Sequence, residues 1–143
     1  MIVRQLQKDS IFVETPDLLD YKVFCFNGEP KYCQVISGRD ETMAIDFFDY
    51  NWKHQEFHEP RNYPFAKVAP PKPSCLDQMW DLVRLLSVDK AFSRIDFYQV
   101  KDKVFGGEIT FSPQVVGIGG FDPEEWDYTF GSMVNLPEVT MQE

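Results

Sequence analysis

The chain lacks any long hydrophobic run. No apolar stretch in its 143 residues approaches the roughly 20 residues that a membrane-spanning helix needs. Arg4, Lys8 and Asp9 interrupt the amino-terminal stretch in which a signal peptide would carry its apolar segment. These absences predict a soluble, cytoplasmic protein with no membrane insertion.

Basic residues are also scarce. Lys and Arg number 14 against 23 Asp and Glu, which gives a formal net charge of -9. This balance argues against the broad phosphate-binding surface that DNA- and RNA-binding proteins use. We therefore expect no nucleic-acid partner, although a local cluster of basic residues could still hold one small phosphate ligand.

Cysteine is sparse and has no pairing pattern. The three cysteines, Cys25, Cys33 and Cys75, include no C-x-x-C pair, so neither a disulfide framework nor a zinc knuckle is indicated. Cys25 and Cys33 flank a hairpin turn at Asn27 and Gly28. A two-residue turn puts Cys25 opposite Pro30 and Cys33 opposite Lys22, and a four-residue turn puts Cys33 opposite Phe24. Neither turn puts the two cysteines opposite each other. We predict three buried, apolar thiols in a reducing compartment.

Aromatic residues are abundant. They make up 15% of the chain, and 13 of them are Phe. They gather in short runs separated by Asn-Gly, Gly-Arg-Asp and Lys-Asp-Lys turns. Such runs favour a largely antiparallel sheet. The predicted strands are 21–26, 32–36, 44–48, 95–100 and 104–111, and residues 11–13 could add a short strand.

Two helices are indicated by spacing and end signals. Apolar residues three and four apart over 76–86 predict an amphipathic helix on the sheet, with Ser74 and Asp77 as a weak capping box. A short second helix is expected with Asp122 as its cap and Gly131 as its end.

Prolines mark one long connection. Five of the ten fall between 60 and 73, and we assign 58–73 as a connecting loop within a single domain, 1–143, because neither side alone holds a complete core. The predicted fold class is α+β. Two β-hairpins and an extra strand pack against one amphipathic helix and a short carboxy-terminal helix.

The second hairpin carries the candidate site. If its turn is the three residues 101–103, Asp96 lies opposite Glu108 and Arg94 opposite Thr110. Two opposed carboxylates cost stability unless a cation joins them or one is protonated. Mg²⁺ suits such a pair, and Arg94 could hold a phosphate oxygen beside it. The alternatives are a one-residue change of register, or an exposed pair that solvent screens.

These residues resemble a known family. RIDF at 94–97 and FGGEITFSP at 105–113 look like the carboxy-terminal metal-binding hairpin of the ATP-grasp superfamily. The wider pattern resembles the TupA-like branch, which is named for teichuronopeptide biosynthesis and occurs in surface-polysaccharide loci. That pattern adds DYKVFCFNG at 20–28, FFD at 47–49, FDPEEWD at 121–127 and Gly131 leading to LP at 136–137. The resemblance runs in consistent order from about residue 11 to residue 137.

ATP-grasp enzymes use ATP and Mg²⁺ to convert a carboxylate to an acyl phosphate, which an amine or thiol then attacks. The resemblance implies that Asp96 and Glu108 bridge Mg²⁺ to the nucleotide phosphates. It implies that Arg94 steadies the phosphoryl group and the acyl phosphate. Thr110 stands where many of these ligases have Asn, so its share in the metal site departs from the family pattern.

The nucleotide-binding residues are implied by the same resemblance. The segment IFVE, which includes Val13 and Glu14, looks like the hinge whose backbone contacts adenine. Asp17 or Asp20 is the candidate for the ribose. Lys22, in the following strand, could reach a phosphate or the substrate carboxylate, which makes it a catalytic as well as a nucleotide-binding candidate.

The family normally holds ATP between two lobes, and this sequence begins just before the hinge. We therefore expect the carboxy-terminal catalytic half of a ligase, inactive alone and completed by an amino-terminal lobe or a partner subunit. One function is an ATP- and Mg²⁺-dependent carboxylate-amine ligase for a carboxylate-bearing saccharide or peptide acceptor, in capsule or cell-wall polysaccharide biosynthesis. The alternative is a non-catalytic nucleotide- or polymer-binding module. No nucleotide-sugar motif supports a glycosyltransferase.

Two smaller features each allow two interpretations. His54 and His58, four residues apart, could form a metal pair on a helix or belong to a solvated loop. Gly117, Gly119 and Gly120 could cradle a substrate anion with their amides or form a flexible loop.

Overall fold

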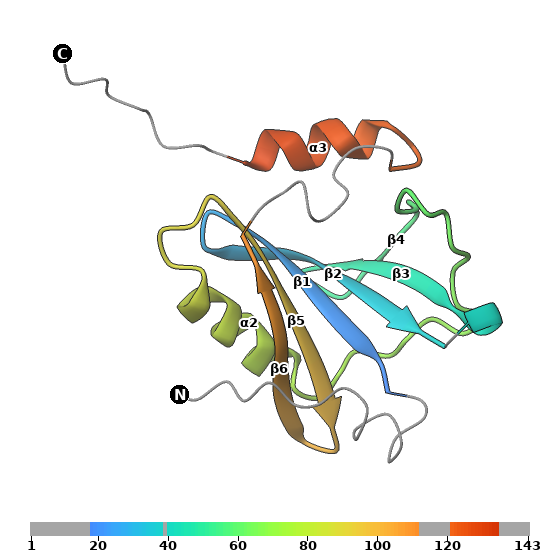
Figure 1. Ribbon diagram of the computed structural model, residues 1–143, viewed down its shortest axis with the longest axis horizontal. Coiled ribbons are helices and arrows are strands. Elements are labelled where there is room, and N and C mark those ends of the chain that lie inside the picture. Colours follow the sequence, from blue (N-terminus) through green and yellow to red (C-terminus); the bar gives the residue numbers. More distant parts are fainter. Residues whose placement is uncertain (1–17, 39, 112–120, 135–143) are drawn as a thin grey trace.

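The computed structural model describes residues 18–38, 40–111 and 121–134. Within them, six strands form one sheet in the order β4-β3-β2-β1-β5-β6, and every neighbouring pair is antiparallel (Figure 1). The α+β class is confirmed. The strands are β1 (Asp20–Phe26), β2 (Glu29–Ser37), β3 (Ala44–Asp49), β4 (His54–Gln55), β5 (Phe92–Val100) and β6 (Lys103–Thr110), and the helices are η1 (Asp40–Thr42, 3-10), α2 (Leu76–Leu86) and α3 (Glu125–Met133).

Helices α2 and α3 cover opposite faces of the sheet (Figure 1). Because side chains alternate along a strand, each strand contributes to both layers. On β1, Val23 belongs to the core beneath α2, whereas Phe24 belongs to the core beneath α3. No helix in the described part of the chain is long and apolar enough to cross a membrane.

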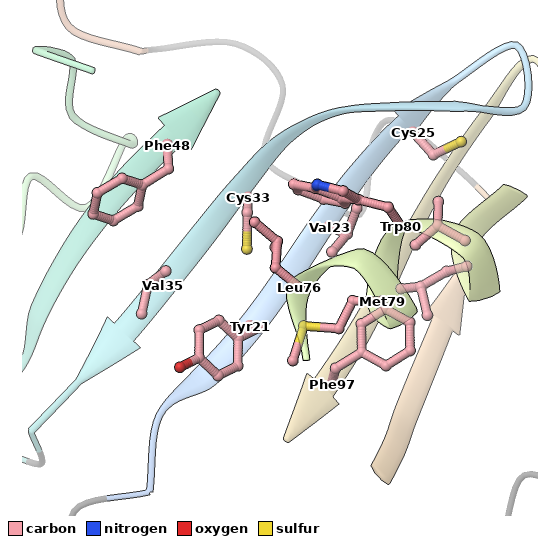
Figure 2. Close-up of a cluster of buried hydrophobic side chains, with 12 residues drawn as sticks. Tyr21, Val23, Cys25, Cys33, Val35, Phe48, Leu76, Met79, Trp80 and Phe97 are labelled. Carbon is pink, nitrogen blue, oxygen red and sulfur yellow. The ribbon is translucent and has the colours of Figure 1, made fainter. Parts of the chain in front are cut away.

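The α2 layer is an aliphatic and thiol-rich core, in which Met79 and Trp80 of α2 project onto the strands (Figure 2). Cys25, Cys33 and Cys75 are free and buried, as predicted, and burial raises the pKa of the Cys33 thiol. Cys33 pairs with Val23 across the hairpin, so the two hairpin cysteines do not face each other.

Helix α2 spans the predicted residues, but its start differs. No side-chain cap forms on the helix, so the predicted capping box of Ser74 and Asp77 is wrong. The reason is a tertiary contact: Gln99 of β5 donates from Nε2 to Ser74 Oγ over 2.8 Å and accepts from the Cys75 N–H over 3.1 Å.

The α3 layer is aromatic. Phe57, which follows β4 in the chain, is fully buried at its centre, with its ring centroid 4.4 Å from that of Phe47 and 4.1 Å from that of Trp126. The predicted cap of α3 by Asp122 is wrong, because the helix begins after Glu124 and Asp122 forms an isolated β-bridge with His58. The helix also continues past Gly131 to Met133.

The histidine pair is not helical. His54 lies on β4 with Nε2 2.7 Å from Asp46 Oδ1, and His58 has Nδ1 3.1 Å from the Tyr63 carbonyl oxygen. The metal-pair interpretation is therefore wrong, because the two rings serve different partners. Gly117, Gly119 and Gly120, and the possible strand at 11–13, lie outside the described residues.

Replacing Phe57 by Ala is expected to lower the free energy of unfolding by about 3–5 kcal/mol, because it empties the centre of the aromatic layer. Urea denaturation measures the change. Tyr128→Ala on α3, where the side chain is 73% exposed, is the control and should shift stability by less than about 0.5 kcal/mol. Equal losses in the two variants would contradict this packing.

Candidate functional site

The candidate site lies on the α3-facing side of β1, β5 and β6. Lys22 of β1 is the direct cross-strand partner of Asp96 on β5, so their side chains leave the sheet on one face. Arg94 lies two residues before Asp96 and therefore shares that face. Three of the residues predicted for the site are brought into contact here.

Asp96 is a buried carboxylate held by two cations. Its side chain is 3% exposed, and Lys22 Nζ donates to Oδ2 over 2.7 Å. Arg94 donates from Nε to Oδ1 over 2.9 Å and from Nη2 to Oδ2 over 3.1 Å. This two-point contact fixes the guanidinium plane and compensates the burial of the charge.

Glu108 occupies the outer edge of the same cluster. Its carboxylate is 61% exposed, and Oε2 lies 3.8 Å from Arg94 Nη2. Arg94 therefore contacts both carboxylates, Asp96 by hydrogen bonds and Glu108 by a longer ion pair. In the structure the guanidinium of Arg94 offsets the repulsion between the two carboxylates. From the sequence alone, a metal ion, a proton or solvent screening was the expected means.

The register of the hairpin differs from the predicted one. The turn consists of two residues, Lys101 and Asp102, rather than three, so Val100 pairs with Lys103. An irregularity between Ile95 and Phe97 then restores the predicted pairing of Arg94 with Thr110. Two residues of β6 consequently face Asp96, and the predicted direct opposition of Asp96 to Glu108 is replaced by a bulge.

Gly107 lies in the bulge, where space for a side chain is tight. A Cβ atom on Gly107 would lie 3.3 Å from the Tyr98 ring, closer than most side-chain contacts, and 3.4 Å from the Asp96 carbonyl oxygen. The backbone of β6 can therefore approach β5 at this point and leave Glu108 directed along the Asp96 face.

The cluster carries a negative field. Asp20 Oδ2 lies 3.2 Å from Lys22 Nζ, which makes three carboxylates around two cations. Burial, and then the charges of Asp20, Asp96 and Glu108, raise the pKa of Tyr98 above its usual value of 10.0. A divalent cation would reduce this field. The described residues contain no group of three or more His, Cys, Asp or Glu placed to hold a metal ion, so a cation here would need phosphate or water oxygens as further ligands.

A cavity of about 390 Å³ adjoins this cluster. Its floor is apolar and includes Phe24 and Phe47 of the α3 layer. Its polar wall contains residues that the sequence did not single out, because β2 and the proline-rich connection supply them. The polar lining residues are Lys22, Gln34, Glu59, Arg61 and Arg94.

The remaining predicted site residues divide into two groups. Thr110 is buried and pairs with Arg94 across the hairpin, two residues beyond Glu108. Val13 and Glu14, and the alternative ribose candidate Asp17, lie outside the described residues.

Comparison with known families identifies one match. The family model described as TupA-like ATPgrasp matches residues 1–135. Comparisons with curated proteins and with solved structures gave no match.

Tyr98 provides a pH test of the buried cluster. The folded phenol keeps its proton at a pH where the unfolded phenol, with a pKa near 10.0, loses it. The free energy of unfolding should therefore fall as the pH rises above about 10, and Tyr98→Phe should remove up to about 1.4 kcal/mol per pH unit of that slope. Denaturant titrations at several pH values measure it. Tyr128→Phe is the exposed control, and identical slopes for the two variants would contradict the assignment.

Proposed function

The chain belongs to the TupA-like ATP-grasp family, and from this premise we propose that it is an ATP- and Mg²⁺-dependent carboxylate-amine ligase, or the catalytic portion of one, in surface-polysaccharide biosynthesis. The observation that carries the proposal is the buried Asp96, held by Lys22 and Arg94 beside the exposed Glu108. An ATP-grasp-related function follows from the family. The ligase reaction, its place in capsule or cell-wall synthesis and the residue roles are the proposal.

The donor set fits Mg²⁺ in an ATP complex. Asp96 and Glu108 are hard oxygen ligands on one face, and Mg²⁺ commonly takes one or two carboxylates with substrate phosphates and water. When bound, the ion would neutralise phosphate charge and orient the terminal phosphoryl group. Because Lys22 and Arg94 hold Asp96 in place, its carboxylate is oriented before any ligand arrives.

In the proposal Lys22 and Arg94 also bind the acceptor. Both line the 390 Å³ cavity and also contact Asp96, so these two residues are shared by the proposed metal site and the space that an acceptor could fill. Each has N–H groups beyond those that bind Asp96. These groups can hold the acceptor carboxylate against the phosphoryl group and bind the negative charge that develops during transfer.

The proposed reaction balances in two steps. An oxygen of the acceptor carboxylate attacks the γ-phosphorus of ATP, and the bond to ADP breaks, which gives an acyl phosphate. The amine nitrogen then attacks the carbonyl carbon, and inorganic phosphate and a proton leave. The acceptor is a carboxylate-bearing saccharide or peptide, and the cavity has the volume of a small-ligand site.

Mg²⁺ with ATP should raise the melting temperature of the protein. At a ligand concentration 100 times Kd, the expected stabilisation is about 2.7 kcal/mol. Glu108→Gln should abolish the Mg²⁺-dependent part of the shift without disturbing the fold, since Glu108 is exposed. Asp96→Asn should abolish it too, with some loss of basal stability because Lys22 and Arg94 lose their shared partner. Differential scanning fluorimetry measures both effects.

Glu56→Gln is the matched control, because Glu56 is exposed and lies outside the cluster. It should leave the shift unchanged. A shift that survives Glu108→Gln and is the same with or without Mg²⁺ would refute the metal-site assignment and favour the non-catalytic binding module.

A further inference from the structure

We propose that Gln34 determines acceptor specificity in the cavity beside Lys22 and Arg94, where its amide binds a hydroxyl group and thereby favours hydroxylated acids over acids that lack hydroxyls. This inference rests on the proposed function, because it takes the cavity as the acceptor's site. It adds a residue outside the metal-binding hairpin and a chemical class of acceptor.

Gln34 is a buried polar residue without a structural partner. It is 5% exposed and lines the cavity, yet its side-chain amide makes no hydrogen bond within the described ranges 18–38, 40–111 and 121–134. Its amide atoms are not fully enclosed by protein, so they are open to the cavity and available to a ligand. An amide presents two donors and one acceptor, which match a hydroxyl or another group that both donates and accepts.

The register places this amide beside the cationic wall. Gln34 of β2 is the direct cross-strand partner of Lys22 on β1, which puts their Cβ atoms about 4.5–5.5 Å apart. On its other side Gln34 pairs with Phe47 of β3, whose ring forms part of the apolar floor. A small acid could therefore place its carboxylate on Lys22 and Arg94, a hydroxyl on Gln34 and a C–H face on the aromatic rings.

The charged residues that line the cavity are already engaged, which leaves the Gln34 amide as the neutral polar group beside them. Arg61 Nε contacts both carboxylate oxygens of Glu59, at 3.0 and 2.9 Å. Lys22 and Arg94 contact Asp96 and keep further N–H groups for the acceptor carboxylate. A hydroxyl of the acceptor can exchange hydrogen bonds with water for hydrogen bonds with the Gln34 amide, whereas a hydrocarbon ring without hydroxyls gains nothing from that amide.

The test compares two acids in nucleotide-free titrations of the full chain followed by NMR. Galacturonate carries a ring, a carboxylate and hydroxyls, whereas cyclohexanecarboxylate lacks the hydroxyls. Galacturonate should bind more tightly. Gln34→Met, which keeps the length of the side chain and removes the amide, should weaken galacturonate about fivefold to tenfold and leave cyclohexanecarboxylate unchanged.

Gln55→Met is the matched control, because the Gln55 amide donates to the Lys53 carbonyl and does not line the cavity. It should leave both affinities unchanged. Galacturonate binding that is no tighter than cyclohexanecarboxylate binding, or that is insensitive to Gln34→Met, would overturn the inference.

Two further measurements separate this inference from the proposed function. Gln34→Met should keep the Mg²⁺- and ATP-dependent melting shift, and Glu108→Gln should lose that shift but keep galacturonate affinity. If the shift is present and galacturonate binding does not depend on Gln34, the inference alone fails. If the shift is absent from the unmodified chain while Gln34-dependent binding persists, the proposed function fails and the acid preference stands.

Stability gives a readout that separates a functional from a structural role. Removing an unpartnered buried amide should leave the melting temperature of Gln34→Met equal to or above that of the unmodified chain. A marked fall would show that the amide serves the fold, and it would overturn the inference.

Discussion

A buried carboxylate on a central strand is the constraint from which the site follows. Asp96 lies on β5 between β1 and β6, and its charge is compensated by Lys22 from one side and by Arg94 from its own strand. Removing such a charge from water is costly unless hydrogen-bonded cations replace the solvent. Their contacts with Asp96 therefore fix the two cations, and the proposed binding of an anionic ligand uses the N–H groups that these contacts leave over.

Two irregularities in the sheet gather the site residues. Between β1 and β2 the register shifts at Phe24, which brings Gln34 opposite Lys22. Between β5 and β6 it shifts beside Asp96, which leaves Glu108 on the same face but nearer to solvent. As a result Asp96 is buried and held by Lys22 and Arg94, whereas Glu108 stays exposed to solvent beside it.

Side-chain periodicity predicted which face of the sheet a residue lies on, whereas the register shifts determine which residues pair across neighbouring strands. Alternation correctly put Arg94 and Asp96 on one side of β5, since a period of two is independent of turn length. Counting outward from an assumed turn left Cys33 opposite Lys22 or Phe24, whereas the structure pairs it with Val23. A shift of one residue moves a side chain to the other face, so the sequence could not associate Gln34 with Lys22.

The missed residues and the wrong helix ends share a physical cause, because each depends on a contact between distant segments. The local sequence at Ser74 and at Asp122 predicted helix caps. In the structure Ser74 instead accepts a hydrogen bond from Gln99, and Asp122 forms a β-bridge with His58. Glu59 lies two residues after Phe57, whose ring packs in the aromatic core against Phe47 and Trp126 and so anchors the start of the connection. An exposed ion pair on a loosely held connection contributes little, because solvent screens it. The aromatic packing that stabilises the α3 layer therefore also helps to hold the ion pair of Glu59 and Arg61 at the cavity, and a wall held in this way lowers the ordering cost of the proposed binding.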